Sequence, residues 1–165
     1  MVLDQGRPDR LRLIDGGEGA ITGTVVCAAA IAYGAGHLEN TAQLSLAILG
    51  TVGVYWLAHL HAVTIGSSLT HRHHPFVALE HALAETLPIA GASVVPLLVL
   101  LVTTLSGASL RTSAWTALMV TIALLAFYSY MAGVRGGLDR GGRIASAAAG
   151  AAIGVLVALL KVALH

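Results

Sequence analysis

Charged residues are scarce in this sequence. They make up 10% of its 165 residues, whereas a soluble domain carries about 25%. Hydrophobic residues make up 56% of the chain, so there is too little polar surface to keep it in water. Apolar stretches of roughly 20 residues recur, and this length crosses about 30 Å of hydrocarbon. The composition therefore predicts a polytopic membrane protein in contact with a lipid bilayer.

Cysteine is nearly absent as well. The only one, Cys27, lies inside an apolar run, so a disulfide within the chain is excluded. The sequence contains no nucleophile–base pair, no phosphate-cradling loop and no haem-attachment motif. We therefore expect no catalytic residues, no organic cofactor and no enzymatic activity. The net charge of +1 gives no indication of binding to nucleic acid.

Polar and glycine-rich breaks divide the chain into apolar stretches. We expect five transmembrane helices, near 18–36, 43–66, 82–105, 113–134 and 144–164, because backbone polar groups in lipid find partners only within a helix. The fold is then all-α, with a segment over 1–17 and a single five-helix transmembrane domain over 18–165. A cleaved signal peptide over 1–36 is the alternative for the first stretch, but its apolar run exceeds the usual length of about 7–15 residues.

Arginine residues indicate the orientation. Seven of them lie in the N-terminal segment and in the second and fourth breaks: Arg7, Arg10, Arg12, Arg72, Arg135, Arg140 and Arg143. The other side has only Arg111 between helices, with Lys161 inside the last span. Because cytoplasmic loops are rich in Lys and Arg, we expect a cytoplasmic N-terminus and a C-terminus outside. We expect the inner (plasma) membrane of a bacterium as the location.

Small residues recur at four-residue intervals in the first and last spans. These are Ala20, Thr24, Ala28, Ala32 and Gly36 in the first, and Ser146, Gly150, Gly154 and Ala158 in the last. Helices in lipid associate by close van der Waals contact, which small residues allow. The pattern predicts tight helix–helix interfaces, either within the subunit or across a homodimer.

Histidine and glutamate residues in the second and third spans form a candidate metal site. His81 and Glu85 are four residues apart and share a helical face, which is the spacing of a helical pair of metal ligands. The short connection makes the two spans antiparallel neighbours, so His59 is expected at a similar depth. His61 points to nearly the opposite face, because two residues on a helix are about 200° apart. Imidazole and carboxylate suit zinc, iron, manganese or nickel and do not select among them.

The connection between these spans, LTHRHHP, carries further histidines. His71, His73 and His74 are candidates for collecting metal from the cytoplasm. They are equally compatible with a belt at the membrane interface that contacts lipid headgroups, and His59 is compatible with a hydrogen-bonded core residue. Glu85 is harder to explain in that way, because an unpaired carboxylate inside a span is costly.

Two prolines follow Glu85 in the third span. Pro88 and Pro96 each lack an amide donor, which frees the carbonyl four residues earlier and can kink the helix. A kinked helix with a histidine and a glutamate in its cytoplasmic third is typical of an element that handles ions.

Charged residues also lie at the ends of the spans. Glu18 opens the first helix, where the helix dipole favours an acidic group. On the outer side, we expect a surface ion pair between Glu39 and Lys161, which would add little stability.

The second half of the chain resembles the vacuolar iron transporter family. The similar stretches are GASVVPLLVLLVTTL, ALMVTIALLAFYSYMAG and RIASAAAGAAIGVLVAL, and GGEGAITGTVV is similar to the opening of that family's first helix. The resemblance implies a dimer that exchanges divalent iron or manganese for protons, with Glu18 as a carboxylate on the ion pathway. The chain departs from the family between helices two and three, where residues 67–78 replace a long Glu- and Met-rich insertion.

These features predict a small membrane transporter or channel for a divalent transition metal of the iron, manganese or zinc class, with or without coupling to protons. The metal is expected as the transported ion, and a homodimer as the assembly. A proton or monovalent-cation pathway gated by histidine is one alternative, since imidazole titrates near pH 6.5. A non-catalytic subunit of a larger membrane complex is another. The identity of the ion and the direction of transport stay open.

Overall fold

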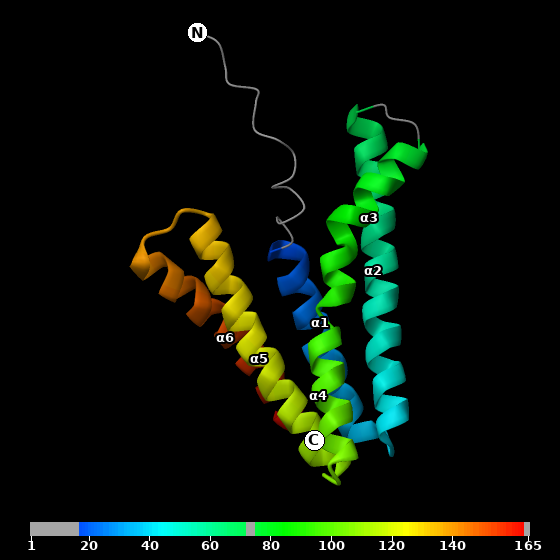
Figure 1. Ribbon diagram of the computed structural model, residues 1–165, viewed down its shortest axis with the longest axis vertical. Coiled ribbons are helices and arrows are strands. Elements are labelled where there is room, and N and C mark those ends of the chain that lie inside the picture. Colours follow the sequence, from blue (N-terminus) through cyan, green and yellow to red (C-terminus); the bar gives the residue numbers. More distant parts are fainter. Residues whose placement is uncertain (1–16, 72–74, 164–165) are drawn as a thin grey trace.

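Helices make up the secondary structure of the part of the chain that the computed structural model describes, residues 17–71 and 75–163 (Figure 1). The helices are α1 (Gly17–His37), α2 (Thr41–His71), α3 (Pro75–Gly91), α4 (Val94–Leu105), α5 (Leu110–Arg135) and α6 (Arg140–Ala163). Five stretches are long and apolar enough to cross a membrane: Glu18–His37, Thr41–Gly66, Ala82–Leu105, Leu110–Arg135 and Arg140–Ala163. The predicted five-helix, all-α architecture is confirmed. The sequence placed the spans to within a few residues of these limits.

The turns between the spans show why the helices end where they do. Gly107 follows α4 with a φ of +87°, and Gly137 follows α5 with a φ of +70°. Residues other than glycine rarely adopt these positive φ values. After α4, the amides of Gly107 and Ala108 donate to the carbonyls of Thr104 and Thr103 (3.0 and 3.2 Å), which is a Schellman motif. Ser109 then caps α5, its side chain accepting a hydrogen bond from the Thr112 amide (3.2 Å).

The five spans alternate in direction, so their connections lie at two ends of the bundle. We call the end with the start of α1, the α2–α3 connection and the α5–α6 turn the inner end, following the predicted orientation. The end with the α1–α2 turn, the α4–α5 turn and the close of α6 is the outer end. α2 has 31 residues and a length of about 46 Å. It therefore extends beyond the hydrocarbon at the inner end.

The helix at the centre of the bundle is α1, which contacts α2, α3, α5 and α6. Its small residues Thr24, Ala28 and Ala32 are buried, as the four-residue spacing predicts, whereas Gly36 is exposed. Larger apolar side chains fill the outer half of the core around them, including Ile31, Leu44, Ile48, Leu100 and Leu118.

The small residues of α6 pack against α5 within the same chain. A Cβ atom at Gly154 would lie 2.9 Å from Ile122 Cγ1, and one at Gly150 would lie 2.7 Å from the Leu125 carbonyl oxygen and 2.8 Å from Ser129 Cβ. Only glycine allows the two helices to approach so closely. The predicted tight interface is therefore one within the subunit. Figure 1 shows that α5 and α6 stay together while both diverge from α1 and α3 toward the inner end.

Candidate functional site

The third span is not one continuous helix. α3 ends at Gly91 and α4 begins at Val94, close to the middle of the Ala82–Leu105 span. The Ser93 amide donates to the Ala90 carbonyl (3.3 Å), one residue short of its α-helical partner Ile89. Because Pro96 has no amide hydrogen, the Ala92 carbonyl also loses its helical donor. Pro96 therefore accounts for the interruption, whereas the helix continues through Pro88.

The backbone of α1 lies directly against this interruption. A Cβ atom at Gly23 would collide with the Ile89 carbonyl oxygen and would lie 2.9 Å from Ile89 Cα and 3.0 Å from Ala92 Cβ. Atoms this close leave no room for a side chain other than hydrogen. One turn earlier, a Cβ atom at Gly19 would lie 3.2 Å from Ile89 Cγ1 and 3.6 Å from Pro88 Cβ. Gly23 therefore fixes where α1 and the broken span meet.

A hydrogen bond sets the depth of α2 relative to α3. The Trp56 indole N–H donates to Thr86 Oγ1 (3.1 Å), and that hydroxyl donates to the Ala82 carbonyl (2.7 Å). The two helices run in opposite directions, so His59 lies about 4.5 Å from the level of this bond toward the inner end. Glu85 and His81 lie about 1.5 and 7.5 Å from it in the same direction. Measured along the bundle axis, Glu85 and His81 thus each lie within about 3 Å of the depth of His59. The short connection predicted this shared depth.

The two histidines of the HLH sequence face different surroundings. His59 is half-buried, and its ring stacks on that of Tyr55 with centroids 6.1 Å apart and planes at 15°. His61 is exposed. This agrees with the angle of about 200° that separates the two positions on a helix. A single imidazole of this pair is therefore turned toward the packed side of α2.

Glu85 occupies a different side of α3 from the one that meets α2. It lies 100° around the helix from Thr86, and it is nearly in line with Ala92, seven residues later. Since Ala92 meets Gly23, Glu85 lies on the α1 side, two turns toward the inner end. Its side chain is exposed.

Glu18 lies in the first turn of α1, as predicted, and its side chain is exposed. The next residue, Gly19, faces Pro88 and Ile89. Glu18 and Glu85 are therefore both near the inner end of the α1–α3 interface, one on each helix.

The remaining predicted ligands lie partly or wholly outside the described residues. The backbone of His81 is part of α3 and that of His71 closes α2, but their side chains are not described. His73 and His74 lie outside the described residues altogether. Among the side chains that are described, no three of the types His, Cys, Asp and Glu come together as a group able to hold a metal ion. His59 and Glu85 share a depth but belong to different helices: His59 is half-buried on α2, and Glu85 is exposed on α3.

Two parts of this arrangement were not visible in the sequence. The Trp56–Thr86 bond joins residues 30 positions apart. Its only sequence signal was a tryptophan one turn from His59. The contact of Gly23 with the broken span had no signal beyond the glycine itself.

A search of protein-family models, curated proteins and solved structures finds no match to the chain.

Proposed function

We propose that the protein is a small membrane transporter or channel for a divalent transition metal, with or without coupling to protons. The observation that supports this proposal is the interrupted third span. It breaks in the middle of the membrane segment, and ionisable side chains from α1, α2 and α3 lie on the inner side of the break.

Broken helices are found where transporters bind ions near the middle of the bilayer. The carbonyls freed at the break supply oxygen ligands without any charged residue. Here Ile89 and Ala92 lose their helical donors at the contact with Gly23. Irregular backbone at this depth is costly unless it is buried in protein or lines a cavity. Here Ile89, Ala92 and Ser93 are buried in protein, and in the proposal the break also supplies ligands for the ion.

The two halves of the broken span have different packing partners. α3 packs against α1 and α2, whereas α4 packs against α5 and, less extensively, α2. The Thr41 and Thr104 hydroxyls, 3.3 Å apart, join α2 to α4 near the outer end. A break between two separately held halves is a natural hinge, and hinge motion exposes a site first to one side of the membrane and then to the other.

Ionisable groups inside a span are retained for a function more often than for stability. In the proposal, Glu18 and Glu85 lead the ion to the break from the inner end, and His59 with His81 binds it or relays protons. His71, His73 and His74 collect the metal in the cytoplasm. Imidazole and carboxylate together suit iron, manganese and zinc as transported ions. The homodimer and the bacterial inner membrane belong to the same proposal.

Flux measurements in proteoliposomes test this function. Vesicles containing a metal-sensitive dye would receive Fe²⁺, Mn²⁺ or Zn²⁺ outside, with and without a pH gradient. We expect His59→Gln and Glu85→Gln each to lower the flux about tenfold or more, the effect typical of losing a group that holds or orients a metal ligand. Matched controls exist on the same helices. His61→Gln and Glu80→Gln change exposed residues of the same kinds and should leave the flux unchanged.

The same experiment separates the alternatives. A current that rises with acid and ignores metal would favour the histidine-gated proton or monovalent-cation pathway. No flux of any kind, together with isolation of the chain in a stable stoichiometric assembly, would favour a subunit of a larger complex. Equal flux for His59→Gln, Glu85→Gln and their controls would remove these residues from the mechanism.

A further inference from the structure

Lys161 is buried at the outer end, and none of the described residues gives it an anionic partner. Its side chain, two residues before the end of α6 at Ala163, is only 9% exposed. Its Nζ atom has no hydrogen-bond acceptor among residues 17–71 and 75–163, so the ion pair predicted with Glu39 does not form. Instead, Nζ lies 4.6 Å from the centre of the Trp115 ring on α5. A cation–π contact offsets only part of the cost of removing an ammonium group from water.

A second positive charge lies close by. Arg111 is exposed in the first turn of α5, four residues before Trp115 and therefore on the same helical face. It is near enough to act electrostatically on Lys161. Two neighbouring cations repel each other, and an anion between them would relieve both this repulsion and the desolvation of Lys161.

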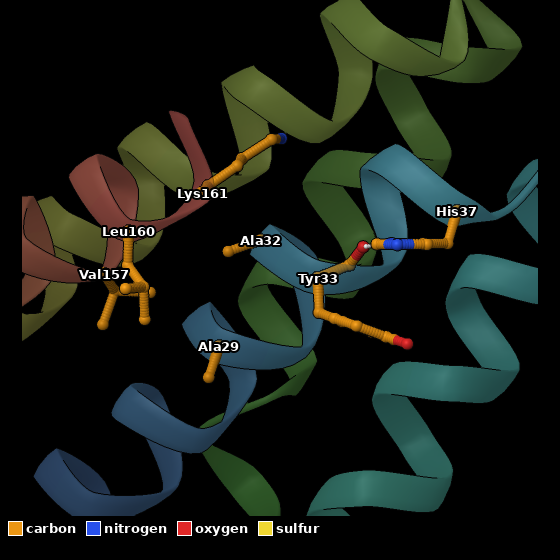
Figure 2. Close-up of a pocket in the computed structure, with 7 residues that line it drawn as sticks. All are labelled: Ala29, Ala32, Tyr33, His37, Val157, Leu160 and Lys161. Carbon is orange, nitrogen blue, oxygen red and sulfur yellow. Dashed lines mark hydrogen bonds between the residues drawn. The ribbon is translucent and has the colours of Figure 1, made fainter. Parts of the chain in front are cut away.

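An apolar cavity of about 420 Å³ adjoins Lys161, between α1 and α6 (Figure 2). Its walls are Ala29, Ala32, Tyr33 and His37 of α1 together with Val157, Leu160 and Lys161 of α6. Figure 2 shows the Lys161 side chain extending from α6 toward α5 at one edge of this cavity. Tyr33 and Leu160 are 68% and 58% exposed, so the cavity borders the surface of spans that face lipid.

We propose that this outer site binds an anionic phospholipid, with an acyl chain in the cavity and the phosphate held by Arg111 and by Lys161, whose Nζ atom turns away from the Trp115 ring to reach it. Ammonium and guanidinium groups bind phosphate strongly because the hydrogen bonds are charge-assisted. The apolar walls and their exposure to the bilayer favour a lipid over a soluble anion. This inference does not depend on the proposed transport function, because the site lies at the opposite end of the bundle from Glu85 and His59.

Quenching of tryptophan fluorescence tests the proposal. The chain has two tryptophans, so Trp56→Phe leaves Trp115 as the only reporter. In phosphatidylcholine vesicles, phosphatidylglycerol with brominated acyl chains should quench Trp115 at a much lower mole fraction than brominated phosphatidylcholine does. Lys161→Met should reduce this preference about tenfold, as expected for losing a hydrogen bond to a charged group. Equal quenching by the two lipids in the Trp56→Phe protein would overturn the proposal.

Further variants keep the test independent of how Lys161→Met folds. Arg111→Gln changes an exposed residue and should also weaken the preference, and Ala29→Phe should abolish it by filling the cavity from its exposed side. Arg140→Gln removes an exposed positive charge at the inner end and should leave the preference intact. Preserved selectivity in both Arg111→Gln and Ala29→Phe would contradict the site.

Native mass spectrometry of the unmodified protein identifies the occupant directly. One phosphatidylglycerol per chain is expected, and Ala29→Phe should remove it. Inorganic phosphate that displaces this lipid with equal potency would show that the ligand is a soluble anion. A dimer that carries no lipid would show that a second copy covers the cavity. Either result would overturn the assignment to a phospholipid.

Discussion

Replacing Gly23 by alanine tests the contact on which the broken third span rests. The added Cβ atom would lie 2.9 Å from Ile89 Cα and 3.0 Å from Ala92 Cβ. Carbon atoms in favourable contact are about 3.5–4.0 Å apart. α1 and the break would therefore have to separate by roughly 0.5–1 Å. The obstructing atoms belong to the backbone and to a Cβ, so no side-chain rotation can relieve the collision.

The size of the effect follows from two opposing contributions. Overpacking of this kind costs about 1–3 kcal/mol, whereas alanine in place of glycine in a helix gains about 1 kcal/mol. Gly53→Ala in α2 isolates the second contribution, because a Cβ atom at Gly53 would meet nothing within 4 Å. We therefore expect Gly23→Ala to be less stable than Gly53→Ala by about 1–3 kcal/mol.

Reversible unfolding in mixed micelles with increasing denaturing detergent, followed by tryptophan fluorescence, measures this difference. Gly53→Ala should be as stable as the parent protein or slightly more stable. If Gly23→Ala unfolds at the same detergent fraction as Gly53→Ala, α1 does not pack closely on the break. The argument for a hinge at Ala92–Ser93 would then lose its basis.

Two further predictions concern the register and the orientation of the bundle. A double-mutant cycle of Trp56→Phe and Thr86→Val should give a coupling free energy of about 1 kcal/mol in the same unfolding assay. This value is typical of a hydrogen bond between membrane helices. Additive effects of the two substitutions would show that Trp56 does not bond to Thr86. In a Cys27→Ala background, a membrane-impermeant maleimide applied to intact cells should label Glu39→Cys at the outer end and spare Arg140→Cys at the inner end. The reverse labelling pattern would invert the predicted orientation.

Some expectations about the polar residues were corrected by the way the helices pack. The sequence paired Lys161 with Glu39 because both lie near the outer surface. In the structure, the Lys161 side chain turns inward over Trp115, since α6 packs along α5 through Gly150 and Gly154. Both prolines of the third span were expected to be able to kink it. Pro96 accompanies an interruption, at the point where Gly23 meets the span, and Pro88 lies inside α3.

The sequence by itself determined the spans, their limits and their alternating directions. These depend on local properties: a helix must enclose its own backbone polar groups in lipid, and the polar breaks between the spans contain residues suited to helix ends, such as Gly107, Gly137 and Ser109. The depth that His59 shares with His81 and Glu85 also followed, because a short connection leaves two antiparallel helices little freedom to slide.

Only the tertiary structure decided how each helix is rotated about its own axis and which neighbours it meets. It left Glu85 exposed and His59 half-buried beside Tyr55, and it brought the Trp115 ring to 4.6 Å from Lys161 Nζ. Hydropathy cannot fix these rotations, because most faces of these helices are apolar and lipid accepts them all equally well. Close contacts at single positions, such as that of Gly23 with Ile89, select one arrangement from the many that the membrane allows.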